Sequence, residues 1–206
     1  MKRLFFIIVA CFSFNTLSAQ TTPLQLRLYG EAGYYFPSSE TSFSVKDHDG
    51  SGAGFGLYGL TPLYKKWSLL AGLGYRYLNN GQSLTYSDNP GYGSDITTYT
   101  IFTNYPKHYL LIPVKLRYTT AHSLYLQSGI ETAWLLNYKY TKANPECNWT
   151  FGIGTGLGQL DWSVQYVQGL TDQAIGDSRS TGPNEQFFTN KYLSVEVSCP
   201  IWKKKQ

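Results

Sequence analysis

The clearest pattern in the chain runs from Tyr109 to Tyr138, where apolar and polar residues alternate one by one. In its first arm, Lys115 and Arg117 fall opposite an apolar row made of Leu110, Ile112, Val114, Leu116 and Tyr118. After a break at residues 119–122, a second arm sets Tyr125, Gln127, Glu131 and Asn137 opposite Leu124, Leu126, Ile130, Trp134, Leu136 and Tyr138. A period of two residues predicts strands and not helices. We therefore expect a hairpin that separates lipid from a polar interior.

The same alternation recurs along the chain and predicts eight strands. They cover residues 24–36, 53–61, 67–78, 109–118, 124–138, 149–157, 162–170 and 191–202. The connections alternate between long and short, which is typical of transmembrane barrels with short periplasmic turns and longer outer loops. An even number of strands places both ends on the periplasmic side. The sequence thus predicts an all-β fold, an eight-stranded antiparallel up-and-down transmembrane β-barrel, over residues 20–206.

Two features modify this simple plan. The longest connection, residues 79–108, contains a stretch at 96–105 that is rich in Thr and aromatic residues, so we expect the flanking strands to continue beyond the membrane as a ribbon. The other long connections, 37–52, 140–148 and 171–190, are predicted as loops. Pro113 lies in the middle of a predicted strand and cannot donate a hydrogen bond, so we expect a bulge there. Pro200 lies close enough to a strand end to be tolerated.

Composition supports a chain whose surface is not mainly in water. Charged residues make up 15% of the chain, against about 25% in soluble domains, and aromatic residues make up 17%. The longest apolar run, residues 4–12, is far shorter than the ~20 residues of a spanning helix. A secreted lipocalin-like barrel has the same alternation with an apolar inside. The low charge content and the aromatic residues at strand ends favour the membrane barrel.

The first 19 residues have the pattern of a signal peptide. Lys2 and Arg3 precede an apolar core, and a small-residue cleavage site ends at Ala19, which implies export and a mature chain from Gln20. An alternative is a lipobox-like sequence that would make Cys11 a lipidated first residue. The remaining Cys147 and Cys199 fall on strands that are not neighbours, so we expect two free thiols.

The polar face carries a set of charges that the barrel would enclose. Four are basic and three acidic: Arg27, Glu31, Arg76, Lys115, Arg117, Glu131 and Glu196. The interior of an eight-stranded barrel is just wide enough for side chains to fill, and unpaired buried charges are costly. We therefore expect these residues to form an ion-paired plug. A narrow channel for ions or a small solute is the alternative.

Candidate chemistry outside the interior is sparse. The run Asp47-His48-Asp49-Gly50 offers metal-ligand atoms, but adjacent residues reach one ion poorly and Asp and Gly are common in turns. An enzyme acting on lipid or peptide at the outer rim would need a histidine beside a carboxylate or hydroxyl. His108 is predicted to lie near this outer rim. The sequence contains no nucleophile motif, phosphate-binding loop or zinc spacing. We expect no catalytic residue, metal or cofactor.

The outer loops are the best candidates for binding. Their aromatic residues resemble the anchors of protein interfaces; they are Tyr86, Tyr92, Tyr99, Tyr105, Phe187 and Phe188. The expected partners are outer membrane lipid and proteins that contact these loops. The net charge, +4 for the whole chain, falls to +2 without Lys2 and Arg3 and does not favour nucleic acid.

The first arm of the central hairpin also resembles a known family. Tyr109, Leu110, Ile112, Pro113 and Lys115 are similar to the corresponding strand motif of the PorT-like outer membrane β-barrel proteins, with Leu111 where that family usually has glutamate. The signal peptide, the eight strands and the apolar-aromatic last strand are similar too. The resemblance implies a place in a Gram-negative outer membrane and, for some members, an accessory role in protein secretion. It implies no catalytic residues.

Overall fold

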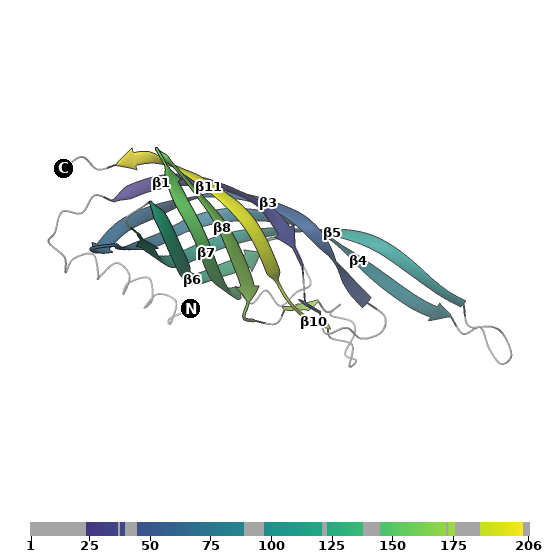
Figure 1. Cartoon of the computed structure of the whole chain (residues 1–206). Coiled ribbons are helices and arrows are strands. Elements are labelled where there is room, and N and C mark those ends of the chain that lie inside the picture. The colour runs from purple at the N-terminus through teal and green to yellow at the C-terminus, as the bar shows by residue number, and fades with distance from the viewer. Residues whose placement is uncertain are drawn as a thin grey trace.

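The chain folds into a closed antiparallel β-barrel with one hairpin that extends well beyond it (Figure 1). The computed structural model describes residues 24–36, 38–39, 45–88, 97–120, 123–137, 145–171, 173–175 and 186–203. The barrel strands are β1 (Gln25–Tyr35), β3 (Val45–Tyr64), β4 (Trp67–Asp88), β5 (Thr97–Thr119), β6 (Leu124–Leu135), β7 (Glu146–Leu157), β8 (Leu160–Gly169) and β11 (Lys191–Lys203). Among these residues, no helix has the length and apolar character needed to cross a membrane.

Each barrel strand pairs with the barrel strands that come before and after it in the sequence, and β1 pairs with β11 to close the sheet. Because closure leaves no open edge within the wall, backbone groups are satisfied without water. The start of β1 and the end of β11 lie at the same end of the barrel, where Gln25 pairs with Lys203. The predicted eight-stranded up-and-down barrel is therefore confirmed.

Three tight turns join strands at the end where Gln25 and Lys203 lie. Each contains a residue with positive φ: Lys65 at 47°, Ser123 at 61° and Gly158 at 66°. Turns of this kind reverse the chain within a few residues. All longer connections therefore leave the opposite end of the barrel, as the alternation of connection lengths predicted.

The structure corrects several predicted loops. The segment 37–52 is not a loop throughout, because β3 begins at Val45, and β7 begins at Glu146 inside the predicted loop 140–148. The predicted loop 171–190 contains β9 (Gln173–Ile175) and β10 (Gln186–Thr189), which form a small separate sheet with β2 (Ser38–Ser39). These segments lack the long apolar alternation of a membrane wall, so the pattern did not show them as strands.

The predicted bulge at Pro113 is wrong. The pairs Ala71–Val114 and Gly74–Leu111 keep one register on either side of it, and Pro113 also stays in register opposite Glu131. Irregularities near prolines lie instead in β11, where the register with β1 shifts between Trp202 and Pro200, and in β3, where the register with β4 shifts between Pro62 and Tyr64. Near the end of a strand a missing donor and an extra residue disturb few neighbouring bonds.

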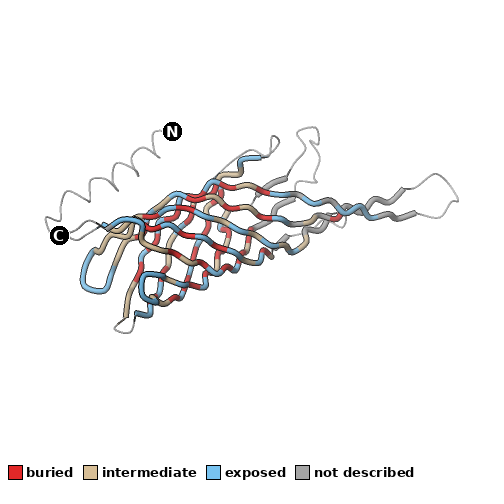
Figure 2. The backbone as a smooth tube through the Cα atoms, turned by 90° about the horizontal axis from the view of Figure 1, so that it is seen from above, coloured by how far each residue is buried: buried red, intermediate tan, exposed pale blue. Residues whose placement is uncertain are grey.

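The two faces of the wall are sharply different, and buried and exposed residues alternate along every barrel strand (Figure 2). Representative outward side chains are Ile112, Leu126, Phe151 and Val195, which are between 37% and 48% exposed. They do not meet in a common core, as they would in a lipocalin-like barrel. The apolar face is therefore the outside, which suits acyl chains.

Aromatic side chains gather at both ends of this apolar band. Tyr64, Trp67 and Trp202 lie at the end with the tight turns, and the Trp67 ring lies 5.0 Å from that of Tyr118. At the other end the Phe36 ring lies 6.2 Å from Tyr34 and 6.3 Å from Tyr166. Such girdles mark the two interfaces of a bilayer.

Cys147 and Cys199 are both free thiols, as predicted. They lie on β7 and β11, which β8 separates in the sheet. The predicted signal peptide, residues 1–19, and the alternative lipidated Cys11 lie outside the described residues.

Candidate functional site

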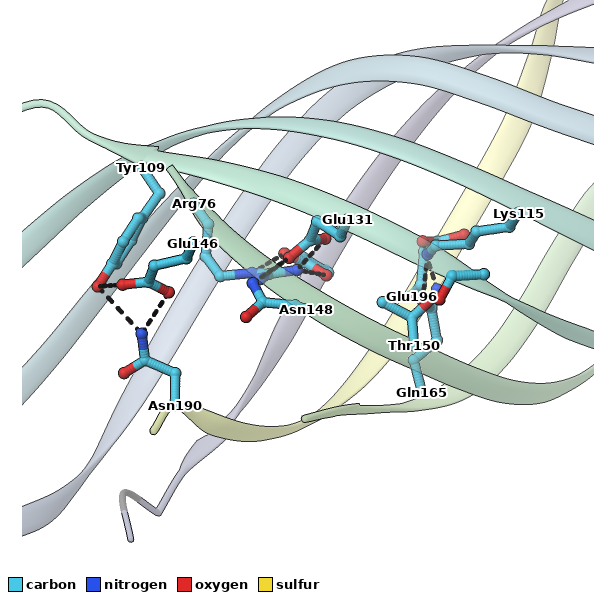
Figure 3. A network of polar contacts seen from close by, with 12 residues as sticks. Arg76, Tyr109, Lys115, Glu131, Glu146, Asn148, Thr150, Gln165, Asn190 and Glu196 are labelled. Atoms are coloured by element: carbon cyan, nitrogen blue, oxygen red, sulfur yellow. Dashed lines mark hydrogen bonds and ion pairs between the residues drawn. The ribbon is translucent and has the colours of Figure 1, made fainter. Parts of the chain in front are cut away.

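The barrel interior is the main concentration of charge in the described chain. Alternation along the strands points every second side chain inward, and the structure places all seven predicted interior charges there, between 2% and 8% exposed. They do not form one cluster. They lie in layers along the barrel, each with its own polar partners (Figure 3).

Arg76 forms the central layer. Its guanidinium binds Glu31 through Nε–Oε1 and Nη2–Oε2 contacts of 2.6 and 3.3 Å, and Glu131 through Nη1–Oε1 and Nη2–Oε2 contacts of 2.6 and 3.0 Å. Asn148 Nδ2 donates to Glu131 Oε1 at 3.4 Å, and the guanidinium lies 4.8 Å from the Tyr192 ring centre. An arginine fork engaging two carboxylates fixes its orientation strongly. The layer ties together β1, β4 and β6.

An outer layer lies between the Arg76 layer and the end that carries the long connections. The Tyr109 hydroxyl donates to Glu146 Oε1 at 3.0 Å, and Asn190 Nδ2 donates to Glu146 Oε2 at 2.5 Å. Asn190 Oδ1 accepts from the Tyr35 hydroxyl at 2.5 Å, and Lys107 Nζ donates to that hydroxyl at 3.5 Å. These residues were not predicted, and they close the outer end of the interior with a carboxylate, an ammonium, an amide and two phenol hydroxyls.

Lys115 and Glu196 form the third layer, joined by Gln165. Lys115 Nζ donates to Gln165 Oε1 at 2.5 Å, and Gln165 Nε2 donates to Glu196 Oε2 and, at 3.3 Å, to Ser163 Oγ. An amide can bridge opposite charges in this way because it carries both a donor and an acceptor.

The fourth layer lies at the end of the barrel that carries the tight turns, and it centres on Asp161. Its Oδ2 contacts Arg117 Nη1 at 2.7 Å and Arg27 Nη2 at 3.3 Å. Arg27 also donates to the Ser198 hydroxyl and carbonyl, both at 3.2 Å, and the Arg117 guanidinium lies 3.9 Å from the Tyr125 ring centre. Two cations sharing one carboxylate carry a net positive charge at this mouth.

The interior charges balance once the missed residues are counted. Lys107, Glu146 and Asp161 join the seven predicted residues and give five basic and five acidic groups in the described interior. Extending the two-residue alternation beyond the ends of the predicted strands would have identified two of them. Lys107 lies an even number of residues from Lys115, and Glu146 lies two residues from Asn148, so each falls on the inward face of its strand. Asp161 was assigned to a turn.

The layers leave little room between them. A cavity of about 10 Å³ lies between the outer layer and Arg76, which is space for about one water molecule. Two atoms of its lining residues, Asn148 Oδ1 and Tyr192 Oη, have no hydrogen-bond partner within the protein. Such an interior suits a packed structural core much better than a water-filled passage.

His108 is on the outward face of β5 and not in the interior. Its Nδ1 lies within hydrogen-bond distance of the Tyr75 hydroxyl, and its ring lies 5.2 Å from that of Tyr77. A hydroxyl partner is therefore present, as the rim-enzyme hypothesis requires. The surroundings are those of an interfacial aromatic cluster, in which histidine and tyrosine pack with their polar atoms paired.

The run from Asp47 to Gly50 lies on β3 and not in a turn. The register between β3 and β4 shifts there, which leaves His48 and Asp49 out of the ladder. The His48 ring packs 5.4 Å from Phe102, whereas Asp49 Oδ2 accepts from the Tyr34 hydroxyl at 2.8 Å. Among the residues that the structure describes, no three His, Cys, Asp or Glu side chains form a group able to hold a metal.

The predicted loop aromatics belong to two different structures. Tyr86, Tyr99 and Tyr105 lie on the β4–β5 ribbon, with Tyr86 opposite Tyr99, and Phe187 and Phe188 lie on β10. Their backbones are described but their side chains are not, and Tyr92 lies outside the described residues.

The similarity of this chain to known proteins is one of structure and not of sequence. No protein-family model and no curated protein matches the sequence. Among solved structures, outer membrane protein OprG from Pseudomonas aeruginosa is similar with a TM-score of 0.50 and 10% identity, covering 87% of this chain and 96% of OprG. The fold is that of a small transmembrane β-barrel.

Two further barrels are more distantly similar. Neisserial surface protein A gives a TM-score of 0.47 at 10% identity, over 84% of this chain and 96% of its own. The translocator domain of autotransporter NalP from Neisseria meningitidis gives 0.36 at 8% identity, over 96% and 95%. At 10% identity, the similarity to OprG concerns the fold alone.

Proposed function

We propose that this chain is an exported outer membrane protein of a Gram-negative cell that works as a surface contact element and not as an enzyme or channel. Its barrel serves as a rigid base, and its outer ribbon and loops meet partner proteins. The similarity to the PorT-like proteins at Tyr109–Lys115 supports an accessory role in protein secretion. The signal peptide pattern, with cleavage after Ala19, supports export.

The observation that carries this proposal is the β4–β5 ribbon. Strand β1 ends at Tyr35, level with Gly50 and Asn80, but β4 and β5 remain paired for ten residue pairs, from Asn79–Pro106 to Asp88–Thr97. At about 3.3 Å per residue this arm is roughly 30 Å long. Figure 1 shows it projecting from one end of the barrel.

The ribbon is stiffened where it leaves the barrel. Strand β3 pairs with β4 as far as Val45–Leu84, so the lower half of the arm has three strands and only its outer part has two. Ordering a long exposed hairpin costs conformational entropy, which a two-stranded ribbon alone recovers poorly. An arm braced in this way fits a role in holding a contact surface at a set distance from the membrane.

The interior complements this role. Arg76 pairs with Glu31 and Glu131, and Asp161 pairs with Arg27 and Arg117, so ions crossing the barrel would have to displace buried salt bridges. The other four charged groups of the layers are held by hydrogen bonds to neutral side chains; they are Lys107, Lys115, Glu146 and Glu196. We expect the purified protein in planar bilayers to give no large, stable single channels. Recordings of such channels would replace the proposed function with that of a pore.

The direct test shortens the arm while keeping the barrel. Residues 85–100 are replaced by Asn-Gly, which joins Leu84 to Ile101 by a two-residue hairpin turn. Cross-linking on intact cells is then compared for the native and shortened proteins, with heat-modifiable gel migration reporting that both barrels fold. The proposal predicts that protein cross-links are lost in the shortened variant. A folded variant with an unchanged cross-link pattern would contradict it.

A further inference from the structure

The outward face of the barrel is hollowed on one side, near the end that carries the tight turns. A groove of about 460 Å³ crosses β4, β5, β6 and β7 there. Its outward side chains are apolar or aromatic apart from one serine, and none is charged; they are Trp67, Leu116, Tyr118, Leu126, Ser128 and Phe151. The groove therefore belongs to the face that meets acyl chains.

The groove forms where a small residue interrupts a row of large ones. Ser128 pairs with Leu116 on β5 and with Phe151 on β7, and its side chain is the smallest of the three. Trp149 Nε1 donates to Ser128 Oγ at 3.1 Å, so this hydroxyl has a partner within the protein and does not depend on water. The hollow around Ser128 is thus compatible with an apolar occupant.

The groove starts at the bilayer interface and stays within one leaflet. Trp67 pairs with Tyr118, and both belong to the aromatic girdle at the tight-turn end. Ser128, deeper in the groove, lies four residues from the start of β6 at Leu124, which is roughly 13 Å along the strand. Because the apolar band of such a barrel is about 25 Å tall, the groove reaches no farther than about its middle.

Two lysines stand at the interfacial end of the groove. Lys65 and Lys66 form the tight turn between β3 and β4, and both are exposed. Lys66 O accepts from Thr119 N at 2.9 Å, which holds the turn beside β5, and Lys66 Nζ lies 6.0 Å from the Tyr118 ring centre. The ion pairs between described residues involve neither lysine. Their positive charge therefore faces the headgroup layer, directly beside the groove.

This combination of a groove and cations matches a phospholipid. An acyl chain gains little by leaving other lipids for the groove, because lipid chains are as apolar as its lining. A chain in the groove does supply van der Waals contacts that the lining atoms would otherwise lack. Selection then depends on the headgroup, since each lysine near the membrane surface favours an anionic lipid by roughly fivefold.

We propose that the groove binds one anionic phospholipid of the leaflet that meets the tight turns. An acyl chain lies along Leu116, Leu126 and Phe151, and the phosphate binds the Lys66 ammonium, with Lys65 close by. This site is separate from the outer ribbon and goes beyond the function proposed for it.

Charge also argues against a second copy of this chain as the occupant. Two copies in one membrane carry their tight turns at the same height, so a contact through this groove would bring lysines of both copies together. Like charges without carboxylate partners oppose such a contact. An anionic headgroup, in contrast, neutralises them.

The test uses the full protein with Trp67 as its sole tryptophan, in phosphatidylcholine vesicles. The other four are replaced: Trp134→Phe, Trp149→Phe, Trp162→Phe and Trp202→Phe. Brominated phosphatidylglycerol or brominated phosphatidylcholine is added as a minor component, and the quenching of Trp67 fluorescence gives the relative binding constant of each. We expect phosphatidylglycerol to bind about fivefold or more tightly at low salt, and high salt to remove most of this preference.

Two pairs of variants separate the lysine from the groove. Lys66→Gln should lower the preference roughly fivefold, whereas Lys191→Gln, which removes the same charge at the opposite end of the barrel, should leave it unchanged. Ser128→Phe fills the groove and should remove most of the preference, whereas Ser128→Ala keeps the hollow and should retain it. Heat-modifiable gel migration reports that each variant is folded.

The inference is overturned if both brominated lipids quench Trp67 equally, or if Lys66→Gln has no more effect than Lys191→Gln. It is also overturned if Ser128→Phe keeps the native preference, because charge alone would then attract the lipid. Exclusion of both brominated lipids from Trp67, together with a cross-linked dimer, would assign the groove to a second copy instead.

Discussion

Removing Arg76 is the sharpest test of the layered interior. In Arg76→Met, Glu31 and Glu131 lose all four contacts of 2.6–3.3 Å to the guanidinium, while both carboxylates stay at least 92% buried. Methionine fills part of the volume but offers no donor. Removing one partner from a buried ion pair costs about 3–5 kcal/mol of unfolding free energy, and here two carboxylates are stranded side by side.

The assay is urea unfolding of the barrel in lipid vesicles, followed by fluorescence of the five tryptophans. The matched variant adds Glu31→Gln and Glu131→Gln to Arg76→Met, which removes the stranded charges. We expect this triple variant to recover most of the loss, because replacing a whole buried ion group is often nearly neutral. Lys66→Gln, at an exposed turn, should change stability by less than about 0.5 kcal/mol.

Two results would refute the reasoning. If Arg76→Met costs less than about 1 kcal/mol, the carboxylates are solvated and the interior is not a packed core. If the triple variant is as unstable as Arg76→Met, the loss comes from side-chain packing and not from unpaired charge.

Two other predictions test the walls around this interior. Gly54→Ala should destabilise the barrel by about 1–3 kcal/mol, because a Cβ there would lie 2.7 Å from Glu31 Oε1 and from the Tyr75 carbonyl oxygen. Gly30→Ala is the control and should be close to neutral, because no atom would lie nearer than 3.9 Å to its Cβ. Equal losses of stability in urea unfolding would argue against a tightly packed inner face. Val195→Arg, on the apolar outer face, should cost about 2–4 kcal/mol in vesicles, but Tyr64→Arg, beside a tight turn, about 1 kcal/mol or less. A Val195→Arg barrel as stable as native in lipid would mean that this face does not meet acyl chains.

The alternation of apolar and polar residues was sufficient to predict most of the fold. From Leu110 to Arg117 each side chain's face followed from its position in the sequence, because successive side chains on a strand point to opposite sides whatever the rest of the chain does. The same rule assigned Arg27 and Glu131 to the polar face and Ile112 and Val195 to the apolar face. It failed where the pattern is short or weakly apolar, as at Val45, at Glu146 and in the small sheet of β2, β9 and β10.

Only the closed barrel decided which charges meet. Arg76 on β4 binds Glu31 on β1 and Glu131 on β6, each two strands away, and Asp161 on β8 joins Arg27 on β1 to Arg117 on β5. The face of a side chain is fixed by local backbone geometry, but its partner across the barrel is fixed by strand register and stagger, which exist only once the sheet has closed.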